Sequence, residues 1–299
     1  MLTRDAAIDR YNAIRARLPQ ASGPAAWSSA NNLGALAAEY DVFVFDAFGV
    51  LNVGATPITG AHARIQALQA MGKQTFVLTN AAGLTDAQTT AKFCALGLDF
   101  EALEVISSRQ ICLEGLKRSF DIRRWGVICP ACGLPDLPGI EFVDLITAPD
   151  GLDDVDGIVL LSTTGLPDTW CDGLEVALRA RPRPVVVGNP DLVAPRETGL
   201  SKEPGFYAHD LIDRLGIAPV FYGKPFANAF EAVERRLTPG FPAAKIAMIG
   251  DTLHTDILGA AARGWGTVLV TGHGLYRGAN VDQLIEISGI VPNWVIPSI

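Results

Sequence analysis

The sequence predicts an α/β protein: a Rossmann-like, doubly wound parallel sheet with a smaller α/β cap domain inserted in it. Short apolar runs such as 42–45 show no polar alternation, which is typical of parallel strands covered on both faces. Segments with helical spacing separate these runs, as in right-handed βαβ units. Between about 122 and 202 the pattern is interrupted by loops rich in proline, glycine and aspartate, after which it resumes.

The larger domain accounts for most of the expected elements. Residues 3–18 have apolar side chains at helical spacing, Pro19 ends that segment, and a second short helix is expected before Tyr40. The remaining elements follow in chain order: strand 42–45, helix 61–71, strand 74–78, helix 85–97, strand 105–108, helix 206–215, strand 220–222, helix 227–236, strand 245–249 and strand 267–270.

The inserted segment has its own strands and helix. Its expected elements are strands 126–129 and 157–161, helix 170–180 and strand 184–188. We therefore predict a core made of residues 1–118 and 206–299, and a cap made of residues 119–205.

The composition excludes several classes of function. The 299 residues are 49% hydrophobic and 19% charged, as in a globular protein, and the net charge of -8 argues against a nucleic-acid partner. No apolar run approaches the roughly 20 residues that span a bilayer, so we expect no membrane segment. The start of the chain lacks a signal-peptide pattern and the five cysteines are sparse, which predicts a cytoplasmic protein with reduced thiols. The oligomeric state stays open, a homodimer included.

A carboxylate stands at the end of the first buried run, where Asp46 follows residues 42–45 directly. In open α/β sheets, chemistry collects beyond the carboxyl ends of the strands, so Asp46 is a candidate nucleophile or metal ligand. The alternative is a turn residue that only ends the strand. The choice depends on whether other segments bring partners to it.

Three later stretches supply such partners. Thr79 ends a predicted strand, where its hydroxyl and the next N–H groups can face an oxyanion. Lys224 follows another strand and is placed to neutralise anionic charge, although a lysine beside a proline is often a solvated loop residue. Asp251 and Asp256 follow a third strand. Three carboxylates that converge with Asp46 need a cation, and all-oxygen ligands favour Mg²⁺.

The order of these motifs resembles the haloacid dehalogenase-like superfamily of aspartate-nucleophile enzymes. Its class IIA branch, which includes NagD-type and p-nitrophenylphosphatase-like enzymes, has an insertion between the Thr and Lys motifs, as here. The segments that carry the resemblance are Val77-Leu78-Thr79-Asn80, Asn189-Pro190-Asp191, Gly223-Lys224-Pro225 and Gly250-Asp251 to Thr255-Asp256-Ile257. The resemblance covers about residues 40–299 and leaves the first 40 without a role.

The resemblance implies a Mg²⁺-dependent phosphohydrolase acting on a small phosphorylated metabolite. Asp46 would attack phosphorus, form an aspartyl-phosphate and bind Mg²⁺ through its other oxygen. Thr79 and Lys224 would hold the phosphoryl oxygens, and Lys224 would also steady Asp46.

The same resemblance implies further metal ligands and a substrate-selecting surface. The backbone carbonyl of Phe48 and the carboxylate of Asp251 would bind the metal, with Asp256 in or near its shell. Substrate binding would fall to Asn80, and to Asn189 and Asp191 on the cap.

Phe48 departs from the family pattern. Phosphatases of the family carry an Asp two residues after the nucleophile as general acid and base, and a phenyl ring cannot replace it. Loss of acid catalysis typically costs about 10²–10⁴ in rate, or roughly 3–5 kcal/mol. A first alternative is therefore a weakened or silenced protein that binds a phosphorylated metabolite. A second is a haloacid dehalogenase, which the acidic cluster and the position of the cap disfavour.

Other features have simpler interpretations. Cys129 and Cys132 have the spacing of half a zinc site, but no second pair completes four ligands. We interpret His254 as a surface residue of a short helix, and Arg196 and Lys202 as charged loop residues that face water.

Overall fold

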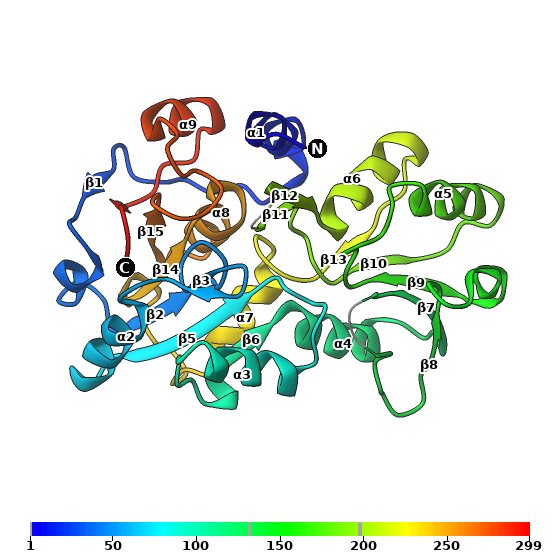
Figure 1. The fold of residues 1–299 in the computed structure, drawn as a ribbon, viewed down its shortest axis with the longest axis horizontal. Coiled ribbons are helices and arrows are strands. Elements are labelled where there is room, and N and C mark those ends of the chain that lie inside the picture. The colour runs from blue at the N-terminus through cyan, green and yellow to red at the C-terminus, as the bar shows by residue number, and fades with distance from the viewer. Residues whose placement is uncertain (1, 131–132, 197–198) are drawn as a thin grey trace.

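The computed structural model describes residues 2–130, 133–196 and 199–299 of the chain, which form two parallel sheets with helices around them (Figure 1). The larger sheet has seven strands, in the order β1 (Ser28–Ser29), β16 (Trp294–Ile296), β15 (Gly266–Val270), β14 (Ile246–Gly250), β2 (Val42–Phe45), β5 (Gln74–Thr79) and β6 (Val105–Ser107). The smaller sheet has five, in the order β13 (Val220–Phe221), β10 (Val185–Val187), β9 (Gly157–Leu160), β7 (Arg124–Ile128) and β8 (Glu141–Asp144). The predicted α/β architecture with a parallel Rossmann-like sheet is thus confirmed.

Helices cover both sheets, and two short hairpins lie outside them. The α-helices are α1 (Arg4–Ala13), α2 (Ala61–Ala70), α3 (Asp86–Ala95), α4 (Ser108–Ser119), α5 (Trp170–Ala180), α6 (Pro204–Leu215), α7 (Ala227–Glu234), α8 (Leu258–Ala262) and α9 (Val281–Ser288). The hairpins pair β3 (Asn52–Val53) with β4 (Thr56–Pro57), and β11 (Val193–Arg196) with β12 (Gly199–Lys202). Among the helices described, none is long and apolar enough to cross a membrane.

The register of the larger sheet brings its strand ends together. β2 lies between β14 and β5, and Phe45 is paired with Ile249 on one side and Val77 on the other. All three strands are parallel and fully buried at these positions. The residues that follow them therefore emerge at one edge of the sheet.

Most expected elements form within a few residues of their predicted bounds, but the differences are informative. The N-terminal helix ends at Ala13 and continues as a 3₁₀ turn, Arg15–Arg17, and the short helix before Tyr40 is a 3₁₀ turn, Leu33–Leu36. Helix α4 was not predicted. Its N-cap is Ser107, whose hydroxyl accepts a hydrogen bond from Gln110 N, so the helix begins directly at the end of β6.

The division into a core and a cap at residues 118 and 205 stays a prediction. Helix α6 and strand β13 lie beyond that second boundary, yet β13 pairs with β10 of the smaller sheet. Tyr207, Ala208 and Leu211 of α6 are buried in the same apolar cluster as strands β9 and β10. A division based on sheet membership would therefore end the inserted unit after Phe221.

A continuous apolar cluster joins the two sheets. Val44 of β2 and Val159 of β9 belong to the same cluster, which also contains Ile111, Cys112 and Leu116 of α4. Helix α4 thus supplies buried side chains to the core shared by the two sheets. Burial of this kind stabilises the arrangement by roughly 25 cal/mol for each Å² of apolar surface.

The N-terminal helix α1 lies between α9 and α6 (Figure 1) and connects the two parts of the molecule. Its Tyr11 ring stacks on His254 at a centroid distance of 5.0 Å, and its hydroxyl accepts a hydrogen bond of 3.1 Å from Leu192 N beside β11. Arg10 and Arg17 both form ion pairs with Asp213 of α6. The segment that had no assigned role in the sequence therefore holds the inserted unit against the larger sheet.

Tyr11→Phe is expected to lower the free energy of unfolding by about 1–3 kcal/mol, because it leaves the buried N–H of Leu192 without its acceptor. Chemical denaturation of both variants measures the change. Tyr222→Phe is the matched control, since the Tyr222 hydroxyl makes no hydrogen bond to another described residue. An equal effect of both substitutions would contradict a specific role for the Tyr11 hydroxyl.

Candidate active site

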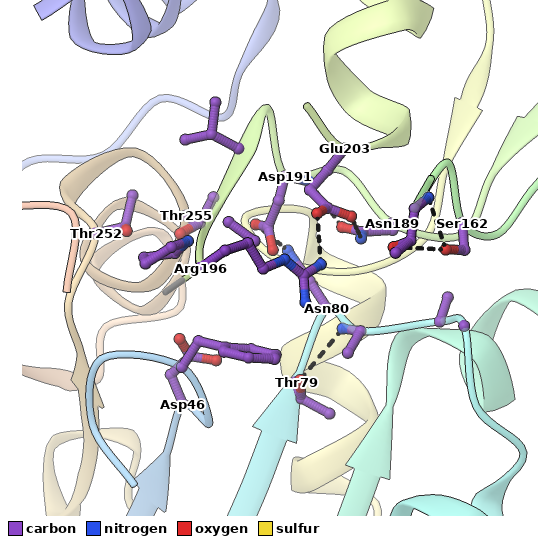
Figure 2. Close-up of a pocket in the computed structure, with 18 of the residues that line it drawn as sticks. Asp46, Thr79, Asn80, Ser162, Asn189, Asp191, Arg196, Glu203, Thr252 and Thr255 are labelled. Carbon is purple, nitrogen blue, oxygen red and sulfur yellow. Dashed lines mark hydrogen bonds and ion pairs between the residues drawn. The ribbon is translucent and has the colours of Figure 1, made fainter. Parts of the chain in front are cut away.

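Four side chains predicted from strand ends do meet at one edge of the larger sheet. Asp46 follows β2, Thr79 is the last residue of β5, and Asp251 follows β14. Asp256 comes from a π-helical turn, Leu253–Ile257, just after it. Figure 2 shows Asp46 and Thr79 at neighbouring strand tips on the same side of the cavity.

The three carboxylates form a compact cluster. One oxygen from each of Asp46, Asp251 and Asp256 lies within 4.8 Å of the others. The close approach depends on glycine, because a Cβ at Gly250 would lie 2.1 Å from the Asp256 side chain. Gly49, at φ +79, likewise leaves room for the Asp251 carboxylate.

A buried lysine balances part of this charge. Lys224 Nζ lies 2.6 Å from Asp46 Oδ1 and 2.7 Å from Asp256 Oδ1, and the residue is only 1% exposed. Burial by itself would lower the pKa of Lys224, but the carboxylates of Asp256 and Asp46 outweigh that effect and raise it. The alternative of a solvated loop residue is therefore wrong for Lys224.

One buried ammonium beside three carboxylates, two of them buried, leaves an excess of negative charge at this edge of the sheet. Burial, and then the neighbouring Asp46, raise the pKa of Asp251. Burial also raises the pKa of Asp256, although Lys224 opposes the shift. Burial is the main cause of both shifts, and the mutual repulsion of the grouped carboxylates adds to it. A divalent cation bound among the three acids would supply positive charge there. The donor set thus fits a hard cation with oxygen ligands.

Hydrogen bonds fix the two acids after β14. Asp251 accepts from Thr252 Oγ1 at 2.8 Å and from Leu275 N at 3.0 Å. Asp256 Oδ2 accepts from Thr252 N at 3.2 Å. These bonds orient both carboxylates toward the cluster before any ligand enters.

Asn80 links the end of β5 to the lysine loop and to the inserted unit. Its Oδ1 accepts from Lys224 N at 2.7 Å, and its Nδ2 donates to Lys224 O at 2.9 Å and to Asp191 Oδ1 at 2.8 Å. Beside it, Thr79 Oγ1 accepts from Ala81 N at 3.2 Å. Asn80 therefore fixes where Lys224 emerges relative to Thr79.

The inserted unit contributes a second polar group on the opposite side of the cavity (Figure 2). Asn189 Oδ1 accepts from Asp191 N at 3.1 Å, and Asn189 Nδ2 donates to Glu203 Oε2 at 3.2 Å. Glu203 also forms an ion pair of 2.9 Å with Arg196. Burial, the largest effect, raises the pKa of Asp191 well above its usual value, although Lys224 opposes the shift.

Most of these groups line one cavity of about 250 Å³, whereas Lys224 and Asp256 lie behind its wall, where Lys224 contacts both Asp46 and Asp256. Its wall combines Asp46, Phe48 and Thr79 of the larger sheet with Asp191 and Arg196 of the inserted unit. Typical small-molecule pockets measure roughly 300–1,000 Å³, so the cavity suits a small metabolite.

Phe48 occupies the place of the expected acid and contacts two cations. Lys92 Nζ of α3 lies 4.3 Å from the centroid of the Phe48 ring, and Arg196 Cζ lies 5.6 Å from it. Burial, and then the nearby Arg196, lower the pKa of Lys92. The cavity therefore has a positive wall next to the acidic cluster.

The structure also corrects two interpretations of single residues. His254 is 1% exposed, stacked on Tyr11 and 3.0 Å from Asn12 Oδ1, so it is not a surface residue. Arg196 lines the cavity and pairs with Glu203, although its side chain stays 32% exposed, whereas Lys202 pairs with Asp168 outside that cavity.

Some cavity residues carried no signal in the sequence. Lys92, Glu203 and Tyr11 lie outside every motif and reach the cavity only through packing of distant elements. Whether Cys129 and Cys132 could form half of a zinc site is not decided, because Cys132 lies outside the described residues.

An α/β fold with an acidic cluster and a buried lysine at the carboxyl edge of its parallel sheet defines a class of aspartate-based hydrolases. Two family models match the chain: haloacid dehalogenase-like hydrolase over residues 43–133 and HAD-hydrolase-like over residues 221–299. The chain belongs to this haloacid dehalogenase-like superfamily. Solved structures of NagD and p-nitrophenyl phosphatases share its fold, as expected for the class IIA branch.

Individual proteins show the same likeness. D-glycerol 3-phosphate phosphatase of Mycobacterium tuberculosis is 30% identical over 246 residues, which are 79% of this chain and 64% of the relative. The chain thus spans less than two thirds of that relative. A possible sugar phosphatase from Cytophaga hutchinsonii is 26% identical at a TM-score of 0.77, over 91% of this chain and 98% of the other. The solved structure of glycerol phosphate phosphatase from Mycobacterium tuberculosis in complex with calcium is 24% identical to this chain. Its TM-score is 0.61, and the match covers 79% of this chain and 67% of the other.

Asn80→Ala is expected to lower the free energy of unfolding by about 2 kcal/mol or more. The substitution leaves the buried N–H and C=O of Lys224 without partners, and each unsatisfied group costs about 1–3 kcal/mol. Denaturation by urea measures the loss. Asn31→Ala, at an exposed position, is the control and should change stability by less than about 0.5 kcal/mol. Similar stability of both variants would contradict the bridging role of Asn80.

Proposed function

We propose that the chain is a Mg²⁺-dependent phosphohydrolase that acts on a small phosphorylated metabolite through an aspartyl-phosphate at Asp46. The observation that carries this proposal is the contact of Lys224 with both Asp46 and Asp256 at the strand ends. The family and the phosphatase relatives support the same reaction class.

Asp46 is the proposed nucleophile. Its side chain is 13% exposed to the cavity, while the lysine at 2.6 Å holds Oδ1. A carboxylate oxygen of Asp46 attacks phosphorus, the bond from phosphorus to the leaving oxygen breaks, and the phosphoryl group is left on Asp46. Water then hydrolyses this acyl phosphate and regenerates the carboxylate.

Thr79 and Lys224 are proposed to hold the phosphoryl oxygens. The hydroxyl of Thr79 lies at the strand tip next to Asp46, and the lysine is fixed by its two carboxylate partners and by Asn80. Charge that is fixed in a dry site stabilises a developing oxyanion without reorganisation.

The metal would be held by the carboxylates of Asp46, Asp251 and Asp256 and by the backbone carbonyl of Phe48. We propose Mg²⁺, because the three acids offer oxygen ligands in an ordered cluster. When bound, the cation would neutralise charge on the phosphoryl group and on the acids.

Asn80, Asn189 and Asp191 are proposed to form the wall that selects the leaving group. All three line the cavity, and hydrogen bonds among them fix their positions. Because both amide atoms of Asn189 are already hydrogen-bonded within the protein, its contribution would be to position Asp191.

Phe48 supports a second candidate function, a protein that binds a phosphorylated metabolite with little turnover. No proton can come from the phenyl ring, so only leaving groups that need little protonation, such as aryl or acyl phosphates, should depart rapidly. The proposed hydrolase and the silenced binder differ in whether the wild type hydrolyses such compounds. A haloacid dehalogenase is a weaker candidate because the acidic cluster is complete.

Asp46→Asn is expected to abolish hydrolysis of p-nitrophenyl phosphate while the fold persists, because the isosteric amide is a poor nucleophile. Steady-state assays with Mg²⁺, together with thermal unfolding, measure both effects. Asp41→Asn, at an exposed aspartate just before β2, is the control and should stay active. Turnover by the Asp46→Asn variant would rule out the aspartyl-phosphate route, and wild-type activity in excess EDTA would rule out the metal.

Phe48→Asp is expected to raise kcat/KM for alkyl phosphates by up to about 10²–10⁴, with a much smaller gain for aryl phosphates, because it restores a proton donor. The measured quantity is the ratio of kcat/KM for Phe48→Asp to that for the wild type, across a series of phosphate esters with different leaving groups. Phe48→Asn controls for the loss of the ring, since an amide of the same shape supplies no proton in this role. A ratio that does not change across the series would contradict the proposal that the wild type lacks only a general acid.

A further inference from the structure

Two cations of the cavity wall come from different parts of the chain and meet at one aromatic ring. Lys92 belongs to α3 beside the larger sheet, and Arg196 ends β11 of the inserted unit. Both line the same cavity as Asp46, and both lie close to the Phe48 ring, at 4.3 Å and 5.6 Å. Both cations can therefore contact a ligand that occupies this cavity together with Asp46.

Arg196 is held rigidly by its own partners. Its Nε donates to Ser201 Oγ at 3.0 Å, and its Nη2 pairs with Glu203 Oε1 at 2.9 Å. The Glu203 side chain is 5% exposed, so this ion pair anchors the guanidinium from behind. An anchored guanidinium presents its remaining N–H groups in a fixed direction, which suits planar anions.

Lys92, in contrast, has no carboxylate partner. Among the described residues, no acid forms an ion pair with its ammonium, and its close neighbour is the Phe48 ring. Cation–π attraction offsets only part of the cost of removing an ammonium from water. The wall therefore carries one ammonium, that of Lys92, without an ion pair to a described acid, since Glu203 pairs with Arg196 and Asp46 acts on Lys92 only through space.

We propose that Lys92 and Arg196 form a subsite for a carboxylate of the phosphorylated substrate, with Phe48 as its apolar side. This deepens the proposed function, on which it rests for the placement of the phosphoryl group at Asp46. A single ammonium without an ion pair, beside an anchored guanidinium, suits a carboxylate better than a second phosphate dianion. The cavity of about 250 Å³ further restricts the substrate to a small phosphorylated acid.

The same arrangement explains why an aromatic residue is compatible with position 48. A carboxyl side chain there would compete with a substrate carboxylate for Lys92. A phenyl ring leaves both cations available and attracts them through its face. Phe48 therefore cannot donate a proton, but it leaves Lys92 and Arg196 able to bind an anion.

Binding of inert ligands tests the subsite separately from turnover. The probes are phosphonopropanoate and hydroxypropylphosphonate, which differ only in a carboxylate against a hydroxymethyl group. Calorimetry with excess MgCl₂ should show that the wild type binds the carboxylated probe about tenfold more tightly. Lys92→Met and Arg196→Gln should each remove most of this preference. Gln is used because its amide can still donate to Glu203.

Lys117→Met, at an exposed position of α4, is the matched control and should keep the full preference. Equal affinities of the two probes in the wild type would overturn the proposal, as would a preference that survives in the Lys92 and Arg196 variants. Absence of binding of either probe would overturn it as well. A carboxylate preference without any phosphatase activity would instead retain the subsite and refute only the proposed hydrolysis.

Discussion

The site depends on a charge imbalance that the fold imposes. One buried ammonium, that of Lys224, faces the carboxylates of Asp46, Asp251 and Asp256 at the edge of a parallel sheet. Grouping carboxylates in a buried site is costly, and burial followed by the neighbouring carboxylates raises the pKa of Asp251, as burial does that of Asp256. Gly49 and Gly250 leave room for the carboxylates, and hydrogen-bond donors orient Asp251 and Asp256.

The placement of the inserted unit over this edge follows from several independent contacts. A continuous apolar cluster runs from the larger sheet through α4 to the smaller one. Asn80 joins the two parts by hydrogen bonds to Lys224 and Asp191, and α1 joins them from outside through Tyr11. Since these contacts differ in chemistry and position, they define one arrangement in which the cavity is closed on the side of the inserted unit.

Position 48 connects the chemistry of the site to its selectivity. In the proposed hydrolysis, the absence of an acid at this position means that the leaving group departs with little protonation, which restricts the range of substrates. The phenyl ring instead lies beside Lys92 and Arg196, so the same substitution gives the cavity a positive wall. Under the proposed function, the acidic cluster and the positive wall together favour a ligand with two separated anionic groups, only one of which would lie beside Asp46.

The sequence by itself determined the parallel α/β fold and the order of the strand-end residues, because buried strands and their ends are encoded by local patterns such as 42–45 followed by Asp46. It also determined which polar residues would share the sheet edge, since parallel strands end on one side. Tertiary structure alone decided the burial of Lys224 and of His254, and the arrival of Arg196 at the cavity. These depend on packing between segments more than a hundred residues apart, and no local spacing encodes such contacts.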